Sequence, residues 1–266
     1  MQEHFFKERG IYYRINQFRQ DRQTLVFVHG VSGSSSAWLK YEQKFENKYN
    51  VLTYDLRGHG KSRKPSSYND YKIEDFTDDL TGLLQYLDIN KFVLISHSFA
   101  ALIALEFLTK HQDEVSEVIF LSPSYHVKER LSAKLIGQLL SLAHLLEIFP
   151  HKDVPGKHID YSTYPNSGDW NIPRMIADVG NTGLKVYLYS SKQALEVNYK
   201  RFLDDIKIPT LIIHGKKDTI FPFRSSVVMN QKIKNSELKL LPNADHILVL
   251  NYFEEVSKAI KRFLEE

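Results

Sequence analysis

The chain has 266 residues and 42% hydrophobic residues, which suits one α/β domain with an insertion, or two small domains, around a large buried core. Lysine and arginine (35) nearly balance aspartate and glutamate (32), so the formal charge of +3 argues against nucleic acid or an anionic membrane as a partner. The absence of cysteine excludes disulfides and thiolate metal sites.

Short apolar runs typical of buried strands recur along the chain. Two alternating segments, HFFK and IYYRIN, meet at Arg9-Gly10 and predict an antiparallel hairpin. Further runs predict parallel strands buried on both faces: LVFV (25–28), VLTY (51–54), FVLI (92–95), VIFL (118–121), TLIIH (210–214) and residues 238–241.

Helical patterns separate these runs, as over residues 73–87. The last helix carries its apolar face between Phe253 and Phe263, and we expect it to begin at a capping box of Asn251 and Glu254. Alternating strands and helices predict an α/β fold, in which a mostly parallel sheet has helices on both faces.

The alternation breaks between Ser122 and Asp205. Residues 128–149 have the pattern of an amphipathic helix, residues 152–173 are rich in Pro, Gly and Asn, and helical patterns follow at 175–179 and 184–202. We predict that residues 122–205 form a helical cap inserted in a core made of residues 1–121 and 206–266.

The longest apolar stretch, near Phe99, is interrupted by Glu106 and is too short to cross a membrane. The charged opening MQEHFFKERG lacks the apolar core of a signal peptide. Together with the missing cysteines, these features predict a cytoplasmic protein without stable membrane insertion.

The segment FVLISHSFA (92–100) places Ser98 between an apolar strand and an alanine-rich helix. A nucleophile elbow has this form, and its strained turn accepts only small residues at the two flanking positions. Those positions usually hold glycine, and here they hold Ser96 and Ala100. An elbow centred on Ser96 would put the bulky Leu94 at a flank, so Ser98 is the candidate nucleophile.

The loop FVHGVSG (27–33) follows an earlier strand. Its glycine lets a following backbone N–H face an anion, which predicts an oxyanion hole made by the amides of Val31 and Phe99. In YDLRGHGKS (54–62), the ending Gly60-Lys61-Ser62 is similar to a phosphate-binding loop, but position 55 is Asp where that motif requires glycine. We therefore interpret this basic stretch as a solvated loop.

Two further strands are followed by an acid and a base. Asp218 lies just after TLIIH, and His246 follows the last strand in LPNADHILV. The order Ser98, Asp218, His246 suits a nucleophile, an orienting carboxylate and a general base. Asp245 is an alternative acid, although the side chains of adjacent residues rarely face each other.

Together these motifs resemble the α/β-hydrolase fold family over essentially the whole chain, through His29-Gly30, residues 55–62, the Ser98 turn, Asp218 and His246. The resemblance implies a sheet of about eight strands, a helical cap over the site, and neither a metal nor an organic cofactor. It also implies a serine esterase that acts on a small-molecule ester with a small to medium acyl group.

Several alternatives remain open at this stage. Lactonases, thioesterases and monoacylglycerol lipases use the same three residues, and a receptor on this fold would bind without catalysis. Candidate pocket residues are Ser32, Tyr125 and Trp170. We interpret the cap histidines, including His144 and His158, as scattered polar residues rather than a metal site, and the sequence does not indicate an oligomeric state.

Overall fold

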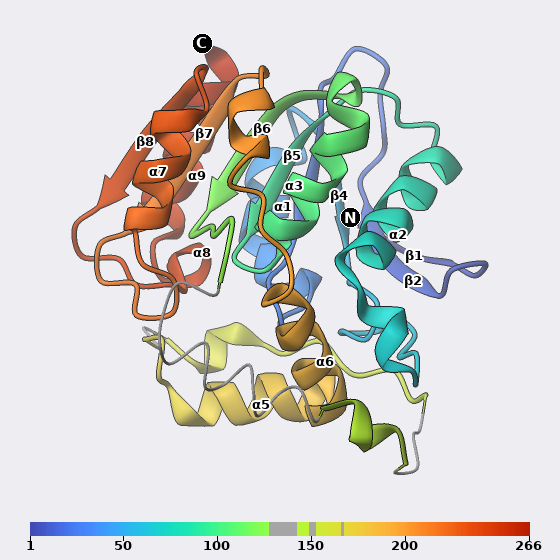
Figure 1. Ribbon diagram of the computed structural model, residues 1–266. Helices are drawn as coiled ribbons and strands as arrows, with labels where there is room; N and C mark the ends of the chain where they lie inside the picture. Colours follow the sequence, from blue (N-terminus) through green and yellow to red (C-terminus); the bar gives the residue numbers. More distant parts are fainter. Residues whose placement is uncertain (128–142, 149–152, 166–167) are drawn as a thin grey trace.

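The computed structural model describes residues 1–127, 143–148, 153–165 and 168–266. Eight strands form one sheet in the order β1-β2-β4-β3-β5-β6-β7-β8 (Figure 1). The strands are β1 (Gln2–Phe6), β2 (Ile11–Ile15), β3 (Thr24–Val28), β4 (Asn50–Tyr54), β5 (Phe92–His97), β6 (Val115–Leu121), β7 (Thr210–Gly215) and β8 (Ser236–Leu241). The β1–β2 and β2–β4 pairs are antiparallel and the others are parallel. The predicted hairpin and mostly parallel sheet are confirmed.

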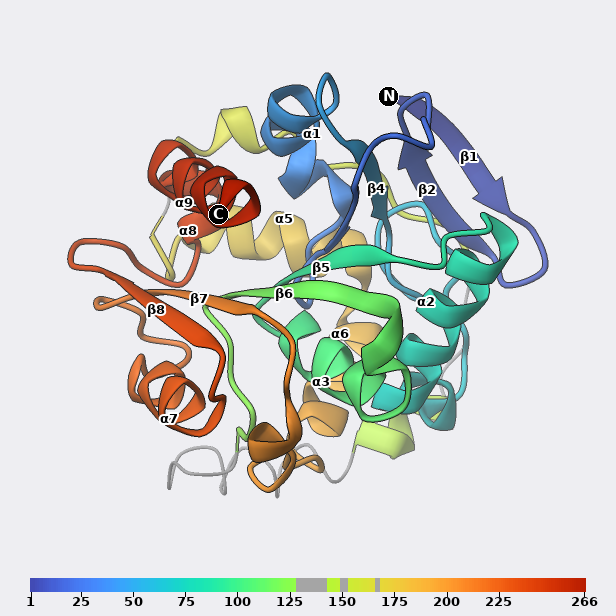
Figure 2. The same ribbon diagram turned by 90° about the horizontal axis from the view of Figure 1, so that it is seen from above.

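Helices cover both faces of the sheet. The α-helices are α1 (Leu39–Phe45), α2 (Ile73–Tyr86), α3 (Ala100–His111), α5 (Ile172–Thr182), α6 (Leu184–Ala194), α7 (Arg224–Lys232), α8 (Leu248–Asn251) and α9 (Phe253–Glu265). Short 3₁₀ turns are η1 (Ser35–Trp38), η2 (Tyr68–Tyr71), η3 (Gln112–Glu114), η4 (Ala143–Ile148), η5 (Tyr161–Thr163) and η6 (Phe202–Asp205). Figure 2 shows α2, α3 and α7 on one face and α1 and α9 on the other.

The central strands contain unbroken apolar runs because both of their faces are covered. In β3, Val26 and Val28 pack into the core under α2 and α3, whereas Leu25 and Phe27 pack into the core under α1 and α9. This alternation follows from the pleat of a strand, which turns successive side chains to opposite faces. Burial on both sides makes the sheet a rigid platform for the loops at its carboxyl edge.

The predicted capping box is wrong. Helix α9 begins at Phe253, and its N-cap residue Tyr252 makes no side-chain capping bond. Residues Leu248–Asn251 form the separate short helix α8, and the Asn251 amide nitrogen lies 3.3 Å from the Asp245 carboxylate. The side chain expected to cap α9 is therefore engaged by the loop that precedes His246.

We call residues 122–205 the cap segment. Its helices α5 and α6 lie beyond the carboxyl ends of the parallel strands (Figure 1), whereas its last turn, η6, lies near the start of β6. Of the helix predicted over 128–149, only residues 143–148 are described, and they form η4. The helix predicted over 184–202 ends at Ala194, because the chain then extends and Asn198 bridges to His126. In the described ranges, no helix has both the length and the apolar character needed to cross a membrane.

Candidate active site

Ser98 occupies the sharp turn between β5 and α3. Its φ of +57° is a left-handed conformation that residues with a side chain seldom adopt. Two backbone hydrogen bonds hold the turn, from the Ser98 amide to the Leu121 carbonyl and from the Ala101 amide to the Ser98 carbonyl, both 2.9 Å. A strained serine held in this way stands above the carboxyl edge of the sheet, where neighbouring loops can reach it.

His246 meets Ser98 from the loop after β8. The Ser98 hydroxyl and His246 Nε2 are 2.6 Å apart, and the opposite ring nitrogen, Nδ1, lies 2.7 Å from Asp218 Oδ2. Gly215 permits this arrangement, since a Cβ there would lie 2.3 Å from the Ala244 carbonyl oxygen. The loops that carry Asp218 and His246 can therefore approach each other closely.

The Asp218 carboxylate is saturated with hydrogen-bond donors. Oδ1 accepts from the amides of Ile220 (2.8 Å) and Phe221 (2.7 Å), and Oδ2 also lies 2.9 Å from His214 Nε2. Burial by itself raises the pKa of Asp218, but the hydrogen bonds and charges of His214 and His246 outweigh burial and hold the pKa well below its ordinary value. Asp218 is therefore an anion over the ordinary pH range.

A second buried histidine, His97, binds the backbone of His246. His97 Nε2 donates to the His246 carbonyl oxygen at 3.0 Å, and the two rings lie 5.3 Å apart. Burial lowers the pKa of His97 to about 3, so the ring stays neutral and keeps one N–H to donate. His97 thus fixes the peptide of His246 without competing for its ring.

The loop after β3 approaches the Ser98 turn closely. A Cβ at Gly30 would lie 3.1 Å from Ser98 Cβ, so only glycine allows this approach without a shift. His29 shapes the loop, since its Nε2 accepts from the Leu56 amide (3.0 Å) and its Nδ1 donates to the Gly30 carbonyl (2.8 Å). Val31 follows directly, and within the described residues its amide and that of Phe99 make no backbone hydrogen bond.

A cavity of about 260 Å³ opens beside Ser98 and His246. The loop after β3, the Ser98 turn and the cap segment all contribute to its walls. On the cap side, Arg174 Nη1 donates to Asp178 Oδ2 (3.0 Å) and the Tyr161 hydroxyl donates to Asp178 Oδ1 (3.0 Å). Burial raises the pKa of Asp178 to about 6 even though both neighbours favour the anion. The cavity wall therefore includes apolar side chains and, on the cap side, a cluster of polar side chains that bind one another.

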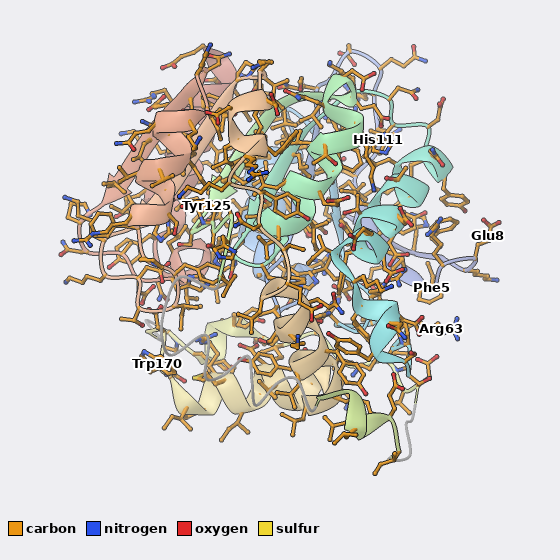
Figure 3. All side chains as sticks on the ribbon, viewed as in Figure 1. Phe5, Glu8, Arg63, His111, Tyr125 and Trp170 are labelled. Atoms are coloured by element: carbon orange, nitrogen blue, oxygen red, sulfur yellow. The ribbon has the colours of Figure 1, made fainter. Side chains whose placement is uncertain are left out.

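The three residues expected in the pocket have different positions. Ser32 lines the cavity, with φ of +61°. Tyr125 does not, because its side chain is 2% exposed and packs in the core under α2 and α3. Trp170 also lies outside the cavity, because it is 64% exposed at the edge of the molecule and its indole N–H donates to Thr219 Oγ1 at 2.9 Å (Figure 3). Tyr161 and Tyr187 line the wall instead.

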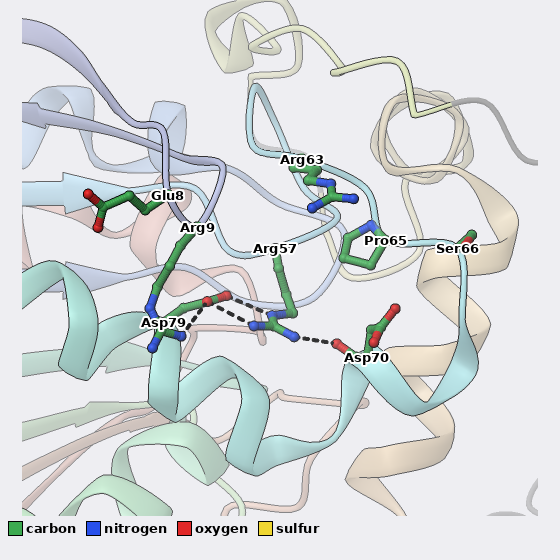
Figure 4. A pocket seen from close by; sticks show the side chains of 8 residues that line it. All are labelled: Glu8, Arg9, Arg57, Arg63, Pro65, Ser66, Asp70 and Asp79. Carbon is green, nitrogen blue, oxygen red and sulfur yellow. Dashed lines mark hydrogen bonds and ion pairs between the residues drawn. The ribbon is translucent and has the colours of Figure 1, made fainter.

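The basic stretch after β4 is only in part the solvated loop that its composition suggests, since Arg63 is exposed whereas Arg57 and His59 are held against the core. Arg57 makes a two-pronged ion pair with Asp79 and donates to the Asp70 carbonyl at 2.7 Å (Figure 4). His59 is fully buried, and burial lowers its pKa to about 3. The Asp79 carboxylate of α2 and the Asp70 backbone carbonyl of η2 therefore hold Arg57, and with it this loop, against the core.

His158 also differs from its interpretation as a scattered polar residue. Its Nε2 donates to Asp55 Oδ2 at 2.8 Å, and the same carboxylate accepts from the amides of Ser35 (2.7 Å) and Lys61 (2.8 Å). Burial raises the pKa of Asp55, but these donors and the charges of His158 and His29 lower it to about 2. His158 thus ties the cap segment to the core.

Sequence reasoning missed two residues that hold the site. His214 is a polar residue at the end of an apolar strand and close to Asp218, which is a signal that could have drawn attention to it. Asp169 accepts from the His246 amide at 2.7 Å, yet nothing in its own sequence neighbourhood points to a residue so distant along the chain.

Comparison with known proteins agrees with this architecture. A profile of the alpha/beta hydrolase fold family matches residues 23–251. An epoxide hydrolase 3 of Xenopus tropicalis is 26% identical over 261 residues, which cover 91% of this chain and 71% of that protein. A proline iminopeptidase of Pestalotiopsis fici is 28% identical over 267 residues, or 93% of each chain. The enol-lactonase structure from Burkholderia xenovorans LB400 has a TM-score of 0.76 at 20% identity, over 96% of both chains.

The chain belongs to the alpha/beta hydrolase fold family. Hydrolysis is the general chemistry that this family supports, whereas the relatives' names span more than one substrate class.

Proposed function

We propose that the protein is a serine hydrolase that cleaves carboxylic esters through an acyl-enzyme. The observation that carries the proposal is the unbroken chain of hydrogen bonds from Ser98 through the His246 ring to Asp218 at the wall of the cavity. A serine hydroxyl becomes a useful nucleophile when a base accepts its proton and a carboxylate orients that base. These three side chains supply each of those groups.

In the first half-reaction, Ser98 Oγ forms a bond to the ester carbonyl carbon while its proton passes to His246 Nε2. The negative charge that develops on the carbonyl oxygen is held by the amides of Val31 and Phe99; losing one such donor typically costs about 100- to 1000-fold in rate. The carbon–oxygen bond to the alcohol then breaks, and the leaving oxygen takes the proton from His246. Asp218 stabilises the intervening imidazolium.

In the second half-reaction, a water molecule attacks the acyl carbon and gives its proton to His246. The bond to Ser98 breaks, the serine recovers that proton, and the carboxylic acid leaves. Reaction requires no further co-reactant, since water supplies the atoms that distinguish acid and alcohol from ester. The cap segment limits access of bulk water during both halves.

The cavity suggests the size of the substrate. Its volume of about 260 Å³ falls slightly below the usual range for ligand pockets, about 300–1,000 Å³. Apolar side chains such as Val127, Met175 and Val179 are part of its wall. A small to medium acyl group fits this space, and long chains would need the cap segment to move.

The names of the relatives suggest other reactions, and Ser98 helps to rank them. Family members that open epoxides carry an aspartate nucleophile, and serine stands at this position here. Lactones and thioesters need the same attack on a carbonyl carbon, so they belong in the substrate panel beside simple aryl esters and an amino-acid anilide.

The first experiment is intact-mass measurement after treatment with a fluorophosphonate, on wild type and on Ser98→Ala. We expect a single adduct on wild type, none on the variant, and hydrolysis of short-chain aryl esters by wild type only. Absence of the adduct on folded wild-type protein, or full turnover by Ser98→Ala, would overturn the proposal and favour a binding protein on this fold.

A further inference from the structure

The carboxylate of Asp169 joins the two loops that carry His246 and Asp218. Oδ1 accepts from the His246 amide at 2.7 Å, and Oδ2 accepts from the Thr219 amide at 2.9 Å and the Thr219 hydroxyl at 2.7 Å. Asp169 is only 7% exposed, which strengthens such bonds because water does not compete for them. One side chain of the cap segment therefore holds both loops.

The backbone of His246 is consequently held by hydrogen bonds at both its N–H and its C=O group. Its amide is bound by Asp169 from the cap segment, and its carbonyl is bound by His97 from the core at 3.0 Å. A histidine fixed at N–H and C=O has little freedom to rotate, so its ring keeps its direction toward Ser98. The first contact comes from the cap segment and the second from the core, so only the first would be lost if the turn at Asp169 were displaced.

The turn that carries Asp169 is itself fixed to helix α5. The Asn171 amide donates to the Gly168 carbonyl at 3.1 Å, and Asn171 caps α5 by accepting from the Arg174 amide. The Arg174 guanidinium also donates to the carbonyls of Gly168 (3.4 Å) and Asp169 (3.3 Å). Because the turn and the helix are linked, a displacement of α5 would move the Asp169 carboxylate with it.

We propose that Asp169 is a positioning residue through which the cap segment holds His246 in line with Ser98, so that the site is complete only while the cap segment is docked. The inference rests on the proposed serine hydrolase function. Asp169 acts through the backbone of His246 and through Thr219, the neighbour of Asp218. Displacing a reacting group by about 1 Å can cost about 100-fold in rate, so the loss of this contact acts on turnover.

The test compares Asp169→Ala with Asp169→Asn, and uses Trp170→Phe as a matched control. The alanine variant loses all three bonds. The asparagine variant keeps an oxygen that can accept from the His246 amide. Trp170→Phe changes the same turn and removes the indole N–H bond to the Thr219 hydroxyl, while the Asp169 carboxylate that accepts from His246 and Thr219 is kept. For each, kcat and KM on a short aryl ester, the rate of fluorophosphonate labelling and the unfolding midpoint are measured.

We expect Asp169→Ala to lower kcat and the labelling rate by about 10- to 100-fold with little change in KM. We expect Asp169→Asn to recover most of the loss and Trp170→Phe to match wild type. Wild-type kcat in Asp169→Ala, or an effect confined to KM, would overturn the inference. If the alanine variant does not fold, Asp169→Asn decides. A labelling rate below that of wild type at an unchanged unfolding midpoint would support the positioning role, and a labelling rate that falls only as far as the stability falls would overturn the inference.

The two proposals can fail separately. An inactive, unlabelled wild type would contradict the serine hydrolase itself. An active wild type whose Asp169 variants keep full kcat would contradict only the positioning role.

Discussion

The histidine–aspartate pair His246–Asp218 at the candidate site and the pair His158–Asp55, which joins the cap segment to the core, have nearly the same hydrogen-bond geometry. His246 Nδ1 lies 2.7 Å from Asp218, and His158 Nε2 lies 2.8 Å from Asp55. Each carboxylate also accepts from two backbone amides, and in each case hydrogen bonds and charge overcome the effect of burial and lower the pKa of the acid.

The pairs differ at the second nitrogen of the imidazole. In His246 this nitrogen lies 2.6 Å from the Ser98 hydroxyl at the cavity wall. In His158 it lies 3.5 Å from the guanidinium of Arg14, which is bound to the buried Glu42. A histidine–aspartate pair is therefore no signature of catalysis by itself, because the group at the second nitrogen determines whether the pair can activate a nucleophile or only join two segments.

Replacing the acid of each pair, Asp218 or Asp55, by asparagine should give the largest difference in kcat between the two pairs. Asp218→Asn should lower kcat on an aryl ester by about 10⁴-fold, because an amide favours the imidazole tautomer that cannot accept the serine proton. Asp55→Asn should keep kcat within about 10-fold of wild type, since Asp55 does not line the cavity. Steady-state kinetics on both variants measure this difference, and equal losses would contradict it.

Asp55→Asn should also have a lower free energy of unfolding than wild type. Asp55→Asn leaves His158 and two backbone amides with a single acceptor oxygen. Hydrogen bonds to a charged group contribute about 1.5–3 kcal/mol each, so we expect a loss of about 3 kcal/mol of unfolding free energy. Urea unfolding at pH 7 measures this quantity. A free energy of unfolding equal to that of wild type would mean that the pair does not hold the cap segment to the core.

Acid should lower the stability of the fold in two pH windows, one set by Asp55 and the other by the buried His59 of the neighbouring loop. The lowered pKa of Asp55 (about 2) stabilises the fold above pH ~4, and this contribution is lost as the pH falls from about 4 to about 2. The lowered pKa of His59 (about 3) makes the fold lose stability from about pH 6.5 downward, because only the unfolded chain takes up that proton.

His59→Asn tests the second window. We expect the buried His59 to contribute a loss of about 2 kcal/mol of unfolding free energy between pH 7 and pH 5, and His59→Asn to lose about that much less over the same interval. Urea unfolding at the two pH values gives both free energies. An unchanged loss in the variant would contradict the assignment of this titration to His59.

The smallest expected effect concerns the donor in the cap segment. His158→Phe removes one hydrogen bond to Asp55 but leaves the amides of Ser35 and Lys61, so it should cost about 1.5 kcal/mol. His158→Gln retains a donor and should stay within about 0.5 kcal/mol of wild type. Unfolding free energies decide, and equal losses in the two variants would show that ring packing, not the hydrogen bond, matters.

The sequence determined the order of the strands along the chain and the candidates Ser98, Asp218 and His246. Apolar runs report burial on both faces of a strand, and small residues around Ser98 report a tight turn, so both signals are local. The same local reading was wrong for the loop at Arg57 and His59, whose composition is polar but whose partners come from elsewhere in the chain.

Only the tertiary structure decided which groups meet. Asp169 and Asp55 acquire their roles from contacts between segments that are distant along the chain, and the residues around each of them give no sign of the partner. The same is true of Tyr125 and Trp170, which resemble pocket residues in the sequence but respectively pack in the core and lie at the surface. Local patterns encode burial and turns, whereas the neighbours of a polar group are set by how the whole chain packs.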